Sequence, residues 1–383
     1  MLSLIYKSFV IVFLGIALLG DRNHGQSFCP LPSPLCSASS IDPRAAAMAV
    51  AISSPQIAIA GSSCLAACSG NKCDPASHPD EILLENIEQL TSPTMGFERA
   101  GEAYFSPDGQ KIIFQAIPIG ANSYQIFTLD LKTRELVQIS QGVQACTCSY
   151  FRPDGEKIIF AASPEKGNVQ QGGKYKWDLT PYMNIYEANV DGTDPVALST
   201  GVAYHAECAY SPDGSHIVYA SNEDGSMNIY AMRSDGTGVQ QLTHTTHCYN
   251  GGPFFSPDGT KIIFRADRAE PNLLQIYMMD SDGSNLVQLT DDGAVNWAPF
   301  WHPSQDVVAY TSSIHGHHNY SVYLLSIGTA EQYRVTYHPI FDGLPTFDQE
   351  GTKMLWTSKR GPDNSCQIFI ADFTLPEGWP SKK

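Results

Sequence analysis

The sequence has 383 residues, with 39 acidic and 23 basic side chains and a formal net charge of −16 at pH 7. A chain this acidic is repelled by phosphate backbones and by anionic lipid, which excludes nucleic acid and an anionic membrane surface as partners.

Residues 1–20, MLSLIYKSFVIVFLGIALLG, hold one lysine followed by a continuous apolar run. This pattern predicts a secretory signal peptide, with an uncleaved N-terminal anchor as the alternative. No later segment is long and apolar enough to suggest a membrane span. The protein is therefore expected in the periplasm or outside the cell.

Residues 21–80 are rich in Ala, Ser, Pro and Cys and contain CPLPSPLC and CLAACSGNKC. We expect a linker, either disordered or closed by a small disulfide knot, because the segment offers little apolar material for a core. The ten cysteines of the chain form an even number, which agrees with disulfides in an oxidising compartment. The CLAAC spacing also suggests metal, but no histidine follows at zinc-finger spacing.

One motif then recurs about every 45 residues, as in YFSPDGQKIIF and FFSPDGTKIIF. An aromatic residue ends one strand, Pro-Asp-Gly makes a tight turn, and a β-branched strand follows. Segments such as LQIYMMD and LVQLT supply a third and a fourth strand. The six turn positions are Pro107, Pro153, Pro212, Pro257, Pro303 and Gln349. The spacing predicts an all-β fold, a six-bladed β-propeller of four-stranded antiparallel blades over residues 81–375, with a tail at 376–383.

One further copy of the fourth strand, NIEQLT at 86–91, precedes the first unit, and the sixth unit lacks a fourth strand of its own. We therefore expect this N-terminal strand to pair with the segment around 366–373. Such pairing completes the last blade and leaves no open edge between the ends of the ring.

The segment FSPDGTKIIF…IYMMDSDGSNLVQLT resembles the propeller repeat of the periplasmic TolB family, and the resemblance covers roughly residues 86–373. It implies a propeller that serves as a scaffold. TolB proteins carry an additional N-terminal α/β domain, for which residues 21–80 leave no room. Oligogalacturonide lyases share the repeat but have seven blades and a histidine-rich manganese site, so six blades argue against transferring that activity.

The loops that enter each first strand share one face of the ring with the loops between second and third strands, and we name this the upper face. It collects seven of the 11 histidines: His205, His244, His247, His315, His317, His318 and His338. Seven residues before each turn stand Ala100, Cys146, His205, Asn250, Asn296 and Asp342. Five residues before it stand Glu102, Cys148, Glu207, Gly252, Ala298 and Leu344. Because side chains two apart share one face of a strand, both sets are expected around the upper mouth of the channel.

Two interpretations of this mouth remain open. Thiolate, imidazole and carboxylate together suit zinc or another divalent transition metal, and the candidate ligands are Cys146, Cys148, His205, Glu207 and His247. In the structural interpretation, Cys146 or Cys148 instead pairs with Cys208 or Cys248 across neighbouring blades.

Three amide and carboxylate side chains at the same channel mouth have two possible roles. Asn250, Asn296 and Asp342 either bind a ligand or satisfy backbone groups at the start of each strand.

Two upper-face loops carry further candidates. The insertion SPEKGNVQQGGKYKWDLTPYM offers Tyr175, Trp177 and Tyr182 as stacking surfaces for a sugar or a peptide, unless it is a simple surface insertion. The HGHH tract at 315–318 is either a metal-binding cluster or a solvated loop.

No nucleophile, metalloprotease, P-loop or dinucleotide motif is present, and Glu102 and Glu207 are weak candidates for an acid and a base. Two functions follow. The favoured one is an exported binding or scaffold propeller that presents its upper face to a protein or a glycan. The other is a metal-dependent polysaccharide lyase or hydrolase that works at the channel mouth.

Overall fold

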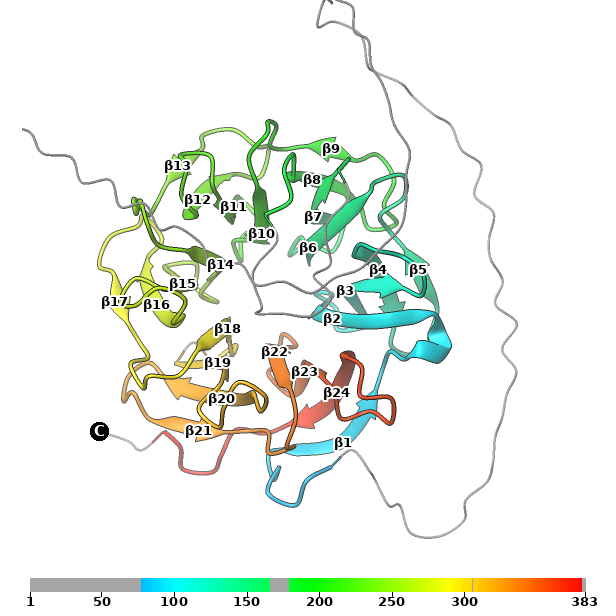
Figure 1. The fold of residues 1–383 in the computed structure, drawn as a ribbon, viewed down its shortest axis with the longest axis vertical. Coiled ribbons are helices and arrows are strands. Elements are labelled where there is room, and N and C mark those ends of the chain that lie inside the picture. Colours follow the sequence, from blue (N-terminus) through cyan, green and yellow to red (C-terminus); the bar gives the residue numbers. More distant parts are fainter. Residues whose placement is uncertain (1–76, 166–178, 305, 381–383) are drawn as a thin grey trace, which may run out of the picture. The chain divides into compact units, whose positions relative to one another are not determined.

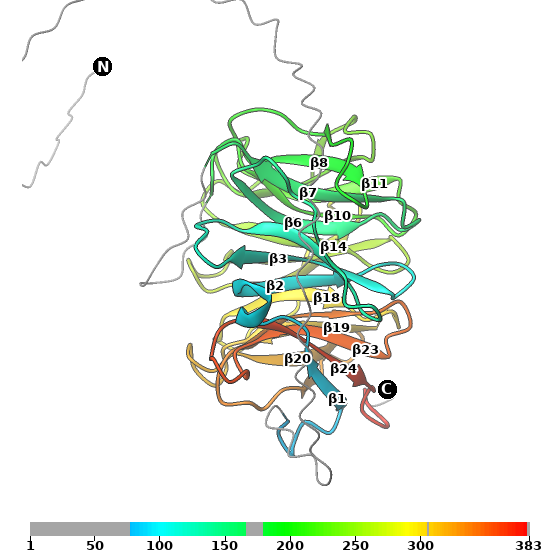
Figure 2. The ribbon, with the colours of Figure 1, turned by 90° about the vertical axis from the view of Figure 1, so that its right-hand side faces the viewer.

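The computed structural model describes residues 77–165, 179–304 and 306–380. Six four-stranded antiparallel sheets are arranged radially around a central channel (Figure 1), and Figure 2 shows the ring edge-on. The prediction of a six-bladed β-propeller is confirmed. The predicted signal peptide at 1–20 and all of the linker up to residue 76 lie outside the described residues.

Blades 1 to 5 each run from an innermost strand outward in chain order. Blades 1 and 2 contain β2 (Phe97–Phe105), β3 (Lys111–Pro118), β4 (Gln125–Asp130), β5 (Leu136–Gln138), β6 (Ala145–Phe151), β7 (Lys157–Ser163), β8 (Asn184–Asn189) and β9 (Val196–Ala197). Blades 3 and 4 contain β10 (His205–Tyr210), β11 (His216–Ser221), β12 (Asn228–Arg233), β13 (Gln240–Gln241), β14 (Asn250–Phe255), β15 (Lys261–Ala266), β16 (Gln275–Asp280) and β17 (Val287–Gln288).

Blades 5 and 6 contain β18 (Asn296–Trp301), β19 (Val307–Ser312), β20 (Ser321–Ser326), β21 (Gln332–Arg334), β22 (Asp342–Phe347), β23 (Lys353–Ser358) and β24 (Gln367–Phe373). The outer strand of blade 6 is β1 (Leu84–Gln89), which pairs antiparallel with β24. The segment 84–89 therefore joins the two ends of the ring. A short 3₁₀ turn, η1 (Pro93–Met95), leads from β1 into β2.

The second strand of each blade is apolar on both faces because it lies between two neighbouring blades. In β3, Ile112 packs into a cluster with Leu355 and Ile368 of blade 6. The next residue, Ile113, packs on the other face with Ile158 and its neighbours in blade 2. Alternation along one strand thus builds two separate inter-blade cores, which explains the continuous KIIF-type runs.

The Ser-Pro-Asp-Gly turns connect first and second strands on the lower face. In blade 1, Ser106 Oγ donates to Asp108 Oδ1 over 2.6 Å, and the same carboxylate accepts the amide of Gln110 at 3.0 Å. Gly109 then adopts φ +67°, which a glycine reaches without steric cost. The turn is therefore satisfied by its own side chains and fixes the register of each hairpin.

Candidate site at the upper channel

Every innermost strand contains a β-bulge at the same position. The register shifts by one residue in β2, β6, β10, β14, β18 and β22. At each bulge one residue has a positive φ, between +51° and +58°. The six residues are Glu102, Cys148, Glu207, Gly252, Ala298 and Leu344. An inserted residue breaks the alternation of side chains, so these six face the channel while residues two positions earlier do not.

Side chains from the preceding blade hold several of these bulges in place. Thr311 Oγ1 accepts the amide of Leu344 at 2.9 Å, and Gln115 Oε1 accepts the amide of Cys148 at 3.3 Å. Both acceptors occupy the same position of a second strand. This cross-blade hydrogen bond stabilises a backbone conformation that costs a non-glycine residue free energy.

Below the bulges, four aromatic rings fill the channel. Tyr104, Tyr150, Phe254 and Phe300 occupy one aligned position in blades 1, 2, 4 and 5, and their ring centroids lie 5.1 to 6.0 Å apart. The same position in blades 3 and 6 holds Ala209 and Thr346, which leave room for the rings. We name these four rings the aromatic plug.

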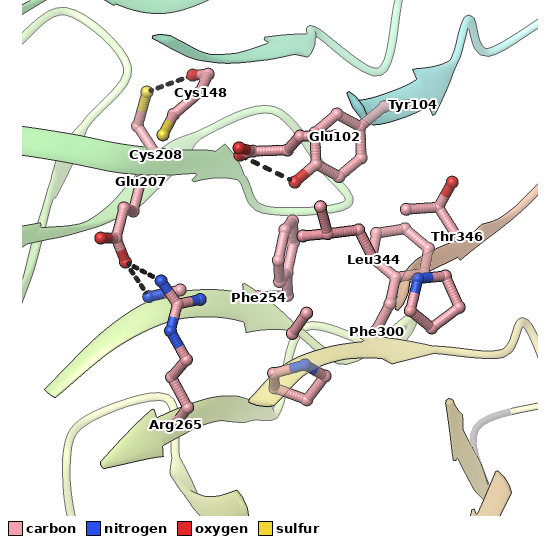
Figure 3. A pocket seen from close by; sticks show the side chains of 14 residues that line it. Glu102, Tyr104, Cys148, Glu207, Cys208, Phe254, Arg265, Phe300, Leu344 and Thr346 are labelled. Atoms are coloured by element: carbon pink, nitrogen blue, oxygen red, sulfur yellow. Dashed lines mark hydrogen bonds and ion pairs between the residues drawn. The ribbon is translucent and has the colours of Figure 1, made fainter. Parts of the chain in front are cut away.

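The plug lies between two cavities. The upper one, of about 40 Å³, is bordered by all six bulge residues and by rings of the plug (Figure 3). The lower one, of about 420 Å³, is bordered by the turn prolines and the aromatic residues that precede them. Among the described residues, the plug therefore blocks the way from the lower cavity to the upper one.

A buried ion pair forms one wall of the upper cavity. Glu207 accepts hydrogen bonds from Arg265 Nη2 at 3.0 Å and from Tyr249 Oη at 2.7 Å, and it also accepts the amide of Gly252. The Glu207 and Arg265 side chains are 5% and 6% exposed, so this pair is taken almost entirely out of water. A buried pair with this many hydrogen bonds is held in one geometry.

Glu102 lies on another wall of the cavity, in blade 1. Its carboxyl group accepts hydrogen bonds from Gln115 Nε2 at 2.8 Å and from Tyr104 Oη at 3.4 Å. Burial, and next the negative charge of Glu207, raise the pKa of Glu102 to about 7, although the Arg265 charge and the Cys148 and Tyr104 side chains act in the opposite direction.

This raised pKa makes a testable prediction. Between pH 4.5 and 7 the unfolded chain has released the Glu102 proton while the folded chain still holds it, so stability falls as the pH rises. In Glu102→Gln this dependence is absent. We expect the free energy of unfolding of the wild type, minus that of the variant, to decrease across this range and to level off above it. Urea titrations of both proteins at a series of pH values measure the difference, and a pH-independent difference contradicts the assigned pKa.

The predicted metal ligands are not brought together. Cys148 and Glu207 border the upper cavity, but Cys146 is buried in the core between blades 1 and 2. His205 is 3% exposed beside Tyr219, and His247 lies exposed on a loop. In the described part of the chain, no three His, Cys, Asp or Glu side chains meet in a group that could hold a metal ion. The residues present therefore do not fit the zinc site that the sequence suggested.

The alternative disulfides are not formed either. Cys146, Cys148, Cys208, Cys248 and Cys366 are all free thiols. Cys208 Sγ instead donates to the Cys148 carbonyl oxygen at 3.4 Å, and burial raises the pKa of the thiols of Cys148 and Cys208.

Asn250, Asn296 and Asp342 do not line the channel, contrary to the expectation from simple alternation. All three are fully buried, because the bulge turns them into the blades. The Asn250 amide donates to the Met227 carbonyl oxygen at 2.9 Å, and that of Asn296 to Gln275 Oε1 at 3.0 Å.

Among the loop candidates, Tyr175 and Trp177 fall outside the described residues. Tyr182 is 43% exposed. In the HGHH tract, His315 Nε2 lies 2.6 Å from Tyr323 Oη and His317 Nδ1 lies 3.3 Å from Tyr320 Oη. These histidines thus contact tyrosines of their own blade.

Sequence reasoning missed Arg265, Tyr249 and the aromatic plug. The plug had a signal, because its residues stand three positions before each turn proline and are aromatic in four of six units. Arg265 had none, since the aligned second-strand positions hold Gln115, Ala161, Ala220, Thr311 and Thr357.

Comparison with known proteins gives relatives for part of the chain. No family model matches the sequence. The Tol-Pal system protein TolB of Anaeromyxobacter dehalogenans is 39% identical over 129 residues, which are 34% of this chain and 27% of that protein. A TolB homologue of Chlorobium luteolum is 31% identical over 160 residues, which are 42% of this chain and 34% of the homologue. The chain thus spans less than half of the length of these relatives.

Solved structures agree on the fold. TolB from Acinetobacter baumannii superimposes with a TM-score of 0.51 at 17% identity, over 72% of this chain and 63% of that one. An oligogalacturonate lyase in complex with manganese has a TM-score of 0.51 at 15% identity, over 76% of this chain and 93% of the lyase. No helix within the described residues has the length and apolar character to cross a membrane.

Proposed function

We propose that this protein is an exported binding or scaffold propeller whose upper face and channel mouth engage a protein or a glycan. The aromatic plug carries the proposal, because within the described residues it closes the channel below a small polar cavity, so that the cavity is approached from the upper face. The partial relationship to TolB proteins supports a binding role. The lyase neighbour supports only the fold, and the described residues offer no ligand group comparable to a manganese site.

A second feature favours binding at this face. Trp297, Tyr320 and Phe341 form an aromatic cluster of partly exposed rings where blades 5 and 6 meet. Their ring centroids lie 5.9 to 6.3 Å apart. Partly exposed aromatic rings supply large contact areas at low entropic cost, and they are enriched at interfaces.

The test compares two aromatic truncations on opposite faces. Partners are captured with the wild-type chain from exported material, identified, and titrated against Tyr320→Ala on the upper face and Phe255→Ala at the lower cavity. We expect about a tenfold or greater loss of affinity for the first variant and no change for the second, as for an interface anchor. Melting curves verify that both variants are folded. A partner that binds both variants equally well, or loses affinity only for Phe255→Ala, overturns the assignment.

A further inference from the structure

We propose that the upper cavity receives a primary ammonium group, the end of a lysine side chain of the protein partner, which pairs with Glu102. This inference rests on the proposed function, since it names the chemical group that enters the mouth. It selects a protein over a glycan as the partner.

The charges of the described residues that border the cavity do not cancel. The guanidinium of Arg265 is bound to Glu207, with Nη2 3.0 Å from Oε2. Glu102 has uncharged donors, Gln115 Nε2 and Tyr104 Oη, and it forms no ion pair with any other residue of the described chain. When Glu102 is ionised, two carboxylates and one guanidinium leave one negative charge in a site largely removed from water, which an entering cation would balance.

The walls of the cavity suit a slender apolar stem behind that cation. Leu344, Ala298, Pro299 and Pro345 border it on the side of blades 5 and 6, and blade 6 adjoins blade 1, which carries Glu102. The rings of Tyr104, Phe254 and Phe300 form its floor, and aromatic rings attract cations. Figure 3 shows Glu102 beside Tyr104, on the same side of the cavity.

The size of the cavity distinguishes between cations. A volume of about 40 Å³ holds about three water-sized groups. Lysine ends in a compact ammonium on an unbranched four-carbon stem, whereas the planar fork of arginine is broader and is matched best by a carboxylate that it meets on both oxygens. The oxygens of Glu102 already accept hydrogen bonds from Gln115 and Tyr104, and those of Glu207 from Arg265 and Tyr249. The space and the available acceptor therefore favour an ammonium.

Binding of the cation is expected to be coupled to loss of a proton. Burial, and next the charge of Glu207, raise the pKa of Glu102 to about 7 without a guest, while Arg265, Cys148 and Tyr104 act in the opposite direction. An ammonium beside the carboxylate favours the ionised form, so binding should release protons near neutral pH and become stronger as the pH rises from about 6 to about 8.

The probe is Nα-acetyl-lysine N-methylamide, titrated calorimetrically into the full chain at about pH 6 and about pH 8. We expect saturable binding that is stronger at the higher pH, no binding of the Nε-acetylated probe, and at least a tenfold loss in Glu102→Gln, the size expected for one charge-assisted hydrogen bond. Glu102→Asp, which keeps the charge on a shorter stem, should lose less. Glu88→Gln, an exposed carboxylate on β1, is the matched control and should bind as the wild type does.

Three results overturn the proposal: no binding of the probe to the wild type, equal binding of the Nε-acetylated probe, or unchanged binding in Glu102→Gln. The partner captured through the upper face separates this proposal from the broader function. If that partner loses affinity for Tyr320→Ala but not for Glu102→Gln, the upper face remains the binding face and the lysine site is wrong.

Discussion

Replacing Arg360 by methionine should lower the free energy of unfolding by about 3–5 kcal/mol, the cost of breaking a buried ion pair. Arg360 follows β23 and lies between two carboxylates. Its Nη1 and Nη2 each lie 2.9 Å from an oxygen of Glu81, and Nη2 also lies 2.8 Å from Asp342 Oδ2. All three side chains are at most 1% exposed. The substitution leaves two buried carboxylates without a cation.

The Arg360 cluster matters because Glu81 lies just before the closing strand, which begins at Leu84. The bridge joins the segment before β1 to the blade that β1 completes, so its loss should loosen the closure of the ring. The Tyr337 amide also donates to Glu81 Oε1 over 2.8 Å.

Urea denaturation measures the effect, with Arg134→Met as the matched control. Arg134 pairs with Glu88 near the surface, where the two side chains are 44% and 52% exposed, so its loss should cost less than about 1 kcal/mol. The loss in free energy of unfolding for Glu81→Gln should lie between those of Arg360→Met and Arg134→Met, because Arg360 still pairs with Asp342. If Arg360→Met is as stable as Arg134→Met, the cluster does not hold the ring closed.

The architecture was predictable because each blade repeats its own local signals. Pro107 and its equivalents mark a turn that its own serine and aspartate satisfy, and two-sided burial demands the apolar run that follows. Both signals can be recognised within one repeat unit of the sequence. Counting the turns therefore predicts the number of blades.

The site was predicted only in part, because it depends on a β-bulge that the residue types at this position do not indicate. Positive φ normally favours glycine, yet only Gly252 among the six bulge residues is one. Assuming strict alternation placed His205, Asn250 and Asp342 around the mouth, whereas the inserted residue turns them into the blades. The residues five positions before each turn, Glu102 and Glu207 among them, do border the upper cavity.

The ion pairs between residues far apart in the sequence were also not predicted. Glu207 meets Arg265 of the next blade, and Asp342 meets Arg360 and Glu81. Arg265 stands at a position that is uncharged in the other five units. The position of Arg360 holds another arginine in blade 4, Arg268, which donates to Asn250 over 2.8 Å. A repeat alignment shows which residue types recur at a position, but it does not show which side chains of neighbouring strands and blades meet.

Truncation of the aromatic plug is the second change with a large expected effect. Phe254 contacts the rings of Tyr104, Tyr150 and Phe300 across the channel. Phe254→Ala removes these contacts and leaves a void between the upper and lower cavities. We expect the free energy of unfolding to fall by about 3 kcal/mol, at the low end for a large-to-small core change, because water from the two cavities can enter the void.

Ala209 offers a sharper test, since it occupies the same aligned position in blade 3. Ala209→Phe alone adds a fifth ring and should cost about 1–3 kcal/mol by overpacking. The double variant Phe254→Ala/Ala209→Phe again has four rings. Its loss in free energy of unfolding should therefore be smaller than the sum of the losses of the two single variants. Urea denaturation of all four proteins measures this coupling. Strict additivity would show that the rings pack independently, and the channel would then not be closed by a shared aromatic layer.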